Sequence, residues 1–183
     1  MKYIYLILIV GLCLGNVLLL KQNLDLRGEL QKYQPKRLQI GDKLQSFRVE
    51  GLTEDSVEVN FSNSGYKKVF LFFTPECPYC QQQLPYWKTL LEKADKNRFE
   101  IIGLLPESED REKAKGYVKS LEYGNLRVAL APPELLKSYQ LSATPTTVIA
   151  SSDGTVEELF AGSWGEQEVA KVEKIFGVEL TKK

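Results

Sequence analysis

The sequence contains no histidine, and it has only three cysteines among its 183 residues. A structural zinc ion takes four ligands, which are usually two cysteine pairs or cysteines combined with histidines. Cys77 and Cys80 form one such pair, and Cys13 lies far from them in the sequence. A single chain therefore cannot complete a zinc site of this kind, and we expect no metal and no other cofactor.

The sequence also lacks an excess of charge of either sign. It contains 24 Lys and Arg residues against 24 Asp and Glu residues, so its formal net charge is zero. Proteins that bind nucleic acids usually carry a surplus of positive charge that contacts the phosphates. We therefore expect no nucleic-acid partner.

The first residues form a long apolar run. Residues 3–20 read YIYLILIVGLCLGNVLLL and contain no charged side chain. A helix of this length is about 27 Å long, close to the hydrocarbon thickness of about 30 Å in a bilayer. Small residues do not cluster as they do at a signal-peptide cleavage site, and Leu12 stands where lipoprotein processing at Cys13 needs a small residue. We expect residues 1–21 to be an uncleaved transmembrane anchor.

A short helical pattern follows the apolar run and predicts a spacer over residues 22–38. Leu19, Leu26, Leu30 and Tyr33 recur at helical spacing, and Pro35 ends the pattern. The pattern spans less than two heptads, which is too short for a stable coiled coil, so we expect a monomer.

The charges around the apolar run bear on its orientation in a membrane. Only Lys2 precedes the run, whereas several basic residues follow it within residues 21–37. By the positive-inside rule alone, the C-terminal part of the chain would lie in the cytoplasm. From the residues themselves, the orientation stays open.

The remaining residues, 39–183, alternate between patterns of strands and helices, which predicts an α/β domain with a sheet covered on both faces. The turn at residues 152–154 predicts a hairpin. We expect strands within residues 47–52, 56–61, 67–73, 99–105, 126–130, 144–150 and 155–160, and helices over residues 78–94, 111–121, 134–139 and 166–176.

The segment TPECPYC, residues 74–80, predicts a redox-active cysteine pair. Cys77 follows a buried strand, and Pro78 suits the first position of a helix. The free N–H groups and the positive end of the helix dipole favour a thiolate at Cys77. Cys80 lies one helical turn further on the same face, near enough to form a disulfide. Cys77 would attack a substrate disulfide, and Cys80 would resolve the mixed disulfide.

This layout resembles a known family. A strand, a C-x-x-C motif, a helix and a distant Thr-Pro before a strand are typical of the thioredoxin fold. Residues 40–164 more narrowly resemble the membrane-anchored TlpA/ResA-like redoxins, through the GD at residues 41–42, the LP at residues 84–85 and the segment YQLSATPTTVIASSDGTV. The resemblance implies a thioredoxin-like fold with a central mixed sheet flanked by helices.

The resemblance also implies functional residues and partners. The bond between Thr144 and Pro145 would be cis and would face the cysteines, the Thr144 main chain would pair with a bound peptide, and Pro78 and Tyr79 would contact the substrate. Protein dithiols or disulfides, including cytochrome c precursors, would be substrates, and a transmembrane electron donor or acceptor would recycle the cysteines. The domain would lie on the periplasmic or extracellular side of the cytoplasmic membrane.

The sequence departs from the family pattern at the residues that handle protons. Leu71 replaces the buried acid of thioredoxin, and Gln83 replaces the glutamate of the TlpA/ResA pattern. Glu76 replaces the usual tryptophan before the first cysteine, and its carboxylate would raise the pKa of Cys77 if it pointed toward the sulfur. Glu50 is a further candidate for an acid near the site.

Three alternatives to the redox function stay open from the sequence. An inert disulfide across so short a loop would stabilise the fold only slightly. Thr74, three residues before Cys77, resembles the threonine of a peroxiredoxin site, although Phe70 replaces that family's proline and no arginine can be assigned. The domain could also be a scaffold that binds partners without catalysis.

Overall fold

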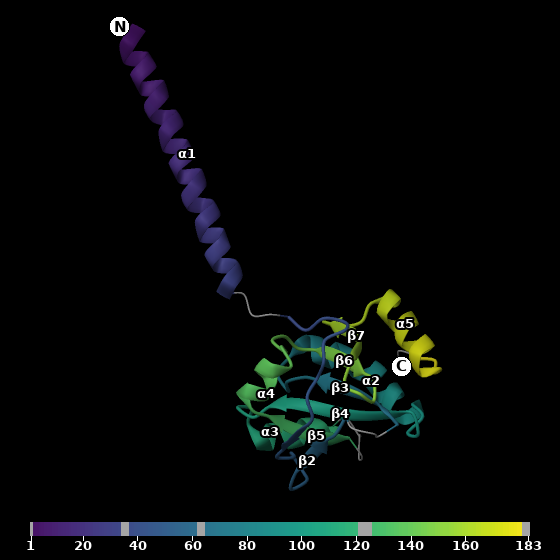
Figure 1. Cartoon of the computed structure of the whole chain (residues 1–183). Helices are drawn as coiled ribbons and strands as arrows, with labels where there is room; N and C mark the ends of the chain where they lie inside the picture. The colour runs from purple at the N-terminus through teal and green to yellow at the C-terminus, as the bar shows by residue number, and fades with distance from the viewer. Residues whose placement is uncertain (1, 34–36, 62–64, 121–125, 181–183) are drawn as a thin grey trace. The chain divides into compact units, whose positions relative to one another are not determined.

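A computed structural model describes residues 2–33, 37–61, 65–120 and 126–180 (Figure 1). The chain divides into two units, Met1–Lys36 and Arg37–Lys183. In the first unit, α1 (Lys2–Tyr33) is one helix that continues through the predicted boundary between anchor and spacer. Among the described residues, no helix combines the length and the apolar character needed to cross a membrane. The predicted end of the helical pattern at Pro35 lies outside the described residues.

The second unit contains the predicted alternation of strands and helices. In chain order the elements are β1 (Phe47–Val49), β2 (Val57–Val59), β3 (Lys67–Phe72), α2 (Pro78–Lys93), β4 (Phe99–Pro106), α3 (Arg111–Ser120), β5 (Arg127–Ala131), α4 (Pro133–Ser138), β6 (Thr146–Ala150), β7 (Val156–Ala161) and α5 (Glu166–Phe176). The prediction extended the first strand to residue 52, but β1 ends at Val49, and Gly51 makes only an isolated bridge to Ala129. The predicted helix over residues 111–121 corresponds to α3, and its predicted end at Leu121 lies outside the described residues.

The central sheet is mixed, and its strand order is β5-β4-β3-β6-β7. β4 is parallel to β3 and β5, whereas β6 is antiparallel to both β3 and β7. β3 is therefore hydrogen-bonded on both sides, and its C-terminal end leads directly into the segment that carries Cys77. The mixed sheet that the family resemblance implies is confirmed.

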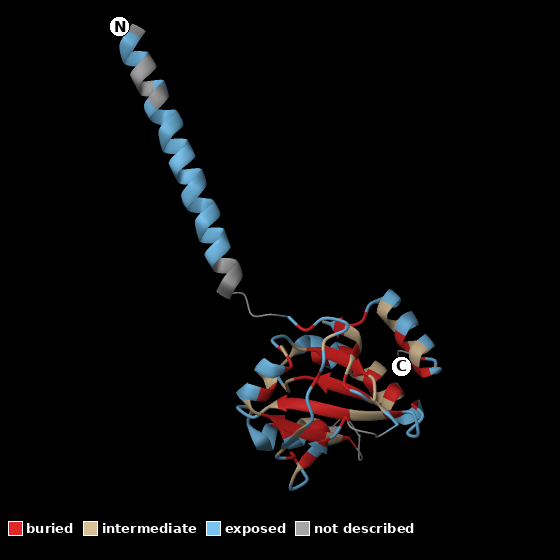
Figure 2. Ribbon diagram, in the orientation of Figure 1, coloured by how far each residue is buried: buried red, intermediate tan, exposed pale blue. Residues whose placement is uncertain are grey.

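Two apolar cores cover the two faces of this sheet. The strands of the sheet are coloured mostly as buried in Figure 2. Successive side chains of a strand point to opposite faces. Leu71 of β3 therefore packs in the core that contains α2, α3 and α5, whereas Phe70 packs in the core that contains α4 and the β1–β2 ribbon. Because both faces are covered, β3 is an almost continuous apolar strand, as the sequence predicts.

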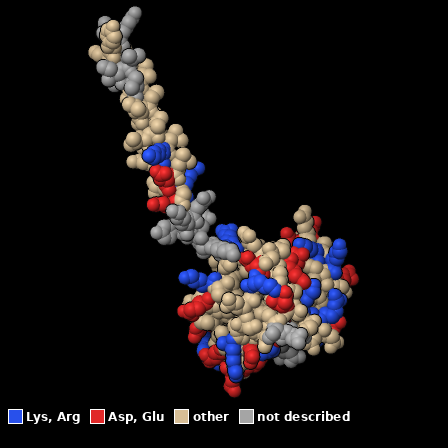
Figure 3. All heavy atoms as spheres, viewed as in Figure 1, with Lys and Arg blue, Asp and Glu red and all other residues tan. Residues whose placement is uncertain are grey.

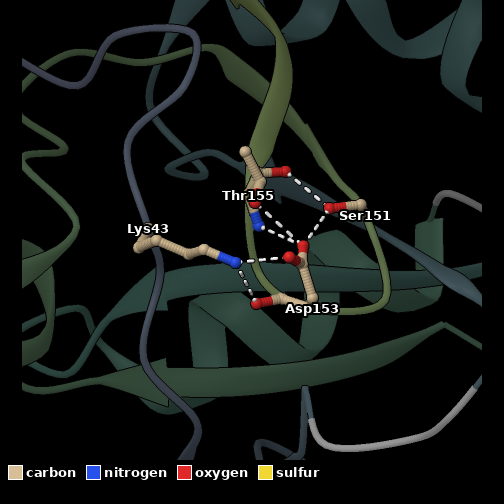
Figure 4. Close-up of polar contacts among 4 residues, drawn as sticks. All are labelled: Lys43, Ser151, Asp153 and Thr155. Atoms are coloured by element: carbon tan, nitrogen blue, oxygen red, sulfur yellow. Dashed lines mark hydrogen bonds and ion pairs between the residues drawn. The ribbon is translucent and has the colours of Figure 1, made fainter.

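The predicted hairpin connects β6 and β7, and its turn is held by Asp153 (Figure 4). The Asp153 carboxylate accepts hydrogen bonds from the main-chain N–H of Thr155 at 3.0 Å and from its hydroxyl at 2.8 Å. Lys43 forms an ion pair with the same carboxylate and donates to the Asp153 carbonyl at 3.1 Å. These donors, with Lys43 the largest contributor, hold the pKa of Asp153 well below its usual range. The contact joins the N-terminal segment of the domain to the hairpin.

An ion network around the buried Lys68 lies at the end of the sheet where β3 begins. The Lys68 side chain is only 4% exposed and pairs with Glu100, its register partner on β4. The other carboxylate oxygen of Glu100 accepts a hydrogen bond from Arg127 of β5 at 2.9 Å. A buried cation is tolerated only when it is paired, so Glu100 is the group that allows Lys68 to lie in the sheet.

We predict that Glu100→Gln lowers the free energy of unfolding by about 3 kcal/mol, because it leaves Lys68 buried without a carboxylate. Lys68→Met should cost much less, because it removes the buried cation and keeps the pair between Arg127 and Glu100. Urea unfolding followed by the fluorescence of the buried Trp87 and Trp164 measures both changes. Equal losses in the two variants would show that the buried lysine does not depend on Glu100.

Candidate active site

Cys77 lies where the central strand turns into a helix. β3 ends at Phe72, and the Cys77 main-chain N–H donates to the carbonyl of Thr74 at 3.3 Å, which closes the turn between strand and helix. Cys77 is the N-cap of α2, and Pro78 is its first helical residue, as predicted. The sulfur of Cys77 therefore takes the place at which an N-cap oxygen normally accepts hydrogen bonds from the first turn.

Two contacts define the position of the Cys77 sulfur. The main-chain N–H of Cys80 donates to Cys77 Sγ at 3.2 Å. On the other side, Cys77 Sγ lies 3.5 Å from the carbonyl oxygen of Thr144. The sulfur is thus held between the helix N-terminus and the loop before β6, which comes from a distant part of the chain.

These surroundings lower the pKa of Cys77. Partial burial raises the pKa, but hydrogen bonds from the Cys80 thiol, the Thr144 side chain and the main chain outweigh it. The main-chain donors are the N–H groups of Cys80 and Tyr79 in the first turn of α2. The thiolate at the helix N-terminus is therefore favoured, as expected from the sequence.

Cys80 has the opposite character. It is fully buried, and burial raises its pKa to about 12, with the hydrogen bond to Cys77 and the charge of Cys77 adding to the shift. Both cysteines are free thiols in this structure. The pair therefore consists of one partly exposed sulfur that ionises readily and one buried sulfur that holds its proton.

The loop that faces Cys77 contains a cis peptide bond between Thr144 and Pro145, which confirms the bond geometry implied by the resemblance. Pro145 is buried, and its carbonyl accepts a hydrogen bond from the main-chain N–H of Gly162 at 2.8 Å. The Thr146 hydroxyl donates to the Ala143 carbonyl at 2.8 Å. These bonds fix the loop beside the sulfur.

The outer rim of the site contains the other predicted residues. Pro78 and Tyr79 are exposed, and Tyr79 is 60% exposed in the first turn of α2. The carboxylate of Glu76 forms an ion pair at 2.9 Å with Lys113 of α3. The Tyr79 ring is therefore exposed at the rim, whereas the Glu76 carboxylate pairs with a side chain of the neighbouring helix α3.

Positions 71 and 83 carry no acid, and the carboxylate of Glu50 is engaged by another side chain. Leu71 is completely buried in the apolar core that contains Cys80. Gln83 is also buried, and its side-chain oxygen accepts a hydrogen bond from the Trp164 main-chain N–H at 2.7 Å. Glu50 makes a bidentate contact with Arg111, which is the main cause of its lowered pKa.

The structure adds Lys113 and Tyr117 to the site, and the sequence analysis missed both. The Tyr117 ring packs against Phe73, with ring centroids 5.7 Å apart. Burial, followed by the charges of Cys80 and Cys77, raises the pKa of Tyr117, so its hydroxyl stays protonated near the two sulfurs. Lys113 and Tyr117 are four residues apart and share a face of α3, but nothing in that spacing indicates which face meets the cysteines.

This arrangement suits thiol–disulfide chemistry. One sulfur is accessible and activated, a second sulfur lies one turn along the same helix, and a fixed loop presents a carbonyl beside the first. In the ranges that the structure describes, no group of three or more Cys, Asp or Glu side chains gathers as a metal site.

Known proteins of similar sequence carry related names. The chain is 27% identical over 136 residues to the thiol-disulfide oxidoreductase ResA of Bacillus cereus, covering 73% of this chain and 76% of that protein. It is 21% identical over 112 residues to the sporulation thiol-disulfide oxidoreductase A of Bacillus subtilis, covering 60% of this chain and 68% of that protein.

Solved structures confirm the thioredoxin-like fold. StoA from Bacillus subtilis aligns with a TM-score of 0.58 at 17% identity, covering 69% of this chain and 95% of that one. A thiol-disulfide isomerase from Corynebacterium glutamicum aligns with a TM-score of 0.61 at 17% identity, covering 78% of this chain and 98% of that one. Residues 39–176, which are most of the chain, match the Redoxin family, and the chain therefore belongs to that family.

Proposed function

We propose that this protein is a thiol–disulfide oxidoreductase that exchanges disulfides with protein substrates through Cys77 and Cys80. The observation that carries the proposal is the placement of the two sulfurs: Cys77 Sγ is partly exposed at the start of α2 and accepts the Cys80 main-chain N–H at 3.2 Å, while Cys80 is buried one turn further along. The opposite directions of the two pKa shifts, lowered at Cys77 and raised at Cys80, agree with this placement. The names of the two relatives, both thiol-disulfide oxidoreductases, support the same activity.

The first step is an attack by the Cys77 thiolate on one sulfur of a substrate disulfide. The bond between the two substrate sulfurs breaks, a bond forms between Cys77 and the attacked sulfur, and the other substrate sulfur leaves as a thiolate that takes up a proton. The hydrogen bond from the Cys80 main-chain N–H keeps Cys77 in the reactive form before the attack.

The second step is resolution by Cys80. Its sulfur gives up a proton and attacks Cys77, the mixed disulfide breaks, and the remaining substrate sulfur leaves and is protonated. The cysteine pair has then lost two electrons, and the substrate has gained them. In the mixed disulfide Cys77 carries no charge, so two of the causes that raise the Cys80 pKa are absent when Cys80 has to ionise.

The rim residues would receive the substrate. An extended peptide that lies along the loop before β6 can form main-chain hydrogen bonds with Thr144, beside the buried Pro145. The exposed Pro78 and Tyr79 present an apolar surface next to Cys77.

A transmembrane electron donor or acceptor would return the cysteine pair to its starting state. Apocytochrome c, with its pair of haem-binding cysteines, is the first protein substrate to test, because of the resemblance to TlpA/ResA-like redoxins.

We further propose that α1 anchors the protein in the cytoplasmic membrane, with the domain on the periplasmic or extracellular side. Residues 3–20 contain no charged side chain, and Lys21, Asp25, Arg27 and Glu29 follow this run. Figure 3 shows a long stretch of α1 without charge and charged side chains toward one end of the helix. The described apolar side chains of this run are exposed and available to lipid. An oxidising location also suits a domain whose only cysteines are the reactive pair.

We predict that alkylation with iodoacetamide at pH 8 modifies Cys77 at least about a thousandfold faster than Cys80, because thiolate is the reactive form. The rate at Cys77 should fall as the pH drops through a midpoint below about 8.5, the value of an ordinary thiol. Mass spectrometry of the Cys13→Ala protein measures both sites separately. Equal labelling of Cys77 and Cys80 would contradict the assignment of roles.

The two steps predict different trapped species. With a peptide disulfide that carries a C-x-x-C-H sequence, the Cys80→Ser protein should accumulate about one mixed disulfide per chain at Cys77, because resolution is blocked. The Cys77→Ser protein should accumulate none. Non-reducing gels and mass mapping in the Cys13→Ala background measure both, and an absent adduct in the Cys80→Ser protein would refute the exchange activity.

The proposed anchor predicts that the domain lies outside the cytoplasm, and an enzyme fused to the domain can test this location. Alkaline phosphatase fused after Leu180 should be active in a bacterial host, because this enzyme needs an oxidising compartment for its disulfides. The same fusion without residues 2–36 is the control, and it should be inactive. An inactive full-length fusion that is present at normal levels would place the domain in the cytoplasm.

A further inference from the structure

Glu76, which carries a carboxylate, directly precedes the proposed nucleophile Cys77 in the chain. A negative charge near a thiolate raises the pKa of the thiol, because it opposes ionisation. Yet hydrogen bonds lower the pKa of Cys77 in this structure, and burial is the cause that opposes them most. The position of the Glu76 carboxylate therefore matters for the reactivity of Cys77.

The structure shows where that carboxylate is held. Glu76 pairs at 2.9 Å with Lys113, which lies in the first turn of α3. α3 is itself fixed, because Ala114 and Val118 are buried in the core and Tyr117 packs against Phe73. Lys113 therefore pairs with Glu76 from a fixed helix, and the pair is solvent-exposed, with 63% of the Lys113 side chain and 76% of the Glu76 side chain accessible, so we expect a modest effect.

The other acids near Lys113 strengthen this arrangement. The pKa of Lys113 is raised mainly by Glu76, and also by Asp110 and Glu109. Without the lysine, the charges of Asp110 and Glu109 would repel the Glu76 carboxylate from α3. A carboxylate that leaves α3 can turn toward Cys77, its neighbour in the chain.

We propose that Lys113 is a positioning residue for the nucleophile, because it holds the Glu76 carboxylate on α3 and away from the Cys77 sulfur. The proposal rests on Cys77 as the attacking thiol of the proposed function. Lys113 itself does not touch the reacting atoms and acts only through Glu76. Among the described residues, Cys80 and Tyr117 also interact with Cys77, and both side chains are kept in the Lys113 variants.

The test measures iodoacetamide alkylation of Cys77 against pH in the full-length Cys13→Ala protein, in detergent at low salt. We expect Lys113→Gln to slow alkylation at pH 7 about two- to threefold and to move the midpoint to higher pH, as one added charge at a few ångström in water would do. Lys113→Arg should keep the pH profile of Cys77 alkylation that the protein with Lys113 shows, because it keeps the positive charge. Salt at about 0.5 M should reduce the effect by screening.

A double-mutant cycle tests whether Lys113 acts through Glu76. In the Glu76→Gln background, Lys113→Gln should have little further effect on alkylation of Cys77. An equal effect in both backgrounds would overturn the proposal, because the lysine would then act directly on the sulfur. Lys115→Gln is the matched control, since Lys115 is on the same helix and pairs with Glu112 at 2.9 Å.

The control also separates a local effect from a general one. Lys115→Gln should leave the Cys77 profile unchanged, and a shift as large as that of Lys113→Gln would overturn the proposal. Failure of the proposed function has a different signature, namely no mixed disulfide at Cys77 in the Cys80→Ser protein. A normal mixed disulfide with identical alkylation profiles overturns only the role of Lys113.

Discussion

The site depends on hydrogen bonding to the sulfur of Cys77, and one of these bonds is donated by the Cys80 main-chain N–H at the start of α2. This bond exists because α2 begins directly after Cys77, so that the first turn points its free N–H groups at the sulfur. The start of α2 depends in turn on β3, which hydrogen-bonds to β4 and β6 and ends at Phe72. The sheet thus fixes the sulfur through the strand that precedes it, and a change in β3 would move the nucleophile.

The two thiols need opposite environments although only two residues separate them. The helix meets this requirement because its first turn has an outer and an inner side. Cys77 caps the helix at the surface, where N–H groups stabilise its charge, while Cys80 lies inside with Leu71 and Trp87 in the core. The shifts also support each other, since the Cys80 thiol lowers the pKa of Cys77 and the Cys77 charge raises that of Cys80.

Local patterns in the sequence predict most of the fold and the centre of the site. Apolar runs and turn residues give the strands and helices to within a few residues, and C-x-x-C with Thr144–Pro145 gives the cysteines and the loop beside them. The pairing of Lys68 with Glu100 and that of Glu76 with Lys113 are not predicted, because each joins side chains from different elements. Such contacts depend on strand register and helix rotation, which one sequence does not specify.

Leu71 and Gln83 stand where the family pattern has acids, so neither position can accept the proton of the Cys80 thiol. A buried carboxylate beside Cys80 could accept the proton, but it would itself be costly to bury. Here Leu71 adds only apolar contact, and Gln83 uses its oxygen to bind Trp164 and so joins α2 to the segment before α5. In the proposed mechanism, formation of the mixed disulfide makes ionisation of Cys80 easier, because it removes the hydrogen bond and the charge of Cys77 that add to the effect of burial on the pKa of Cys80. In the proposed mechanism the first step therefore promotes the second, and positions 71 and 83 supply no buried base for it.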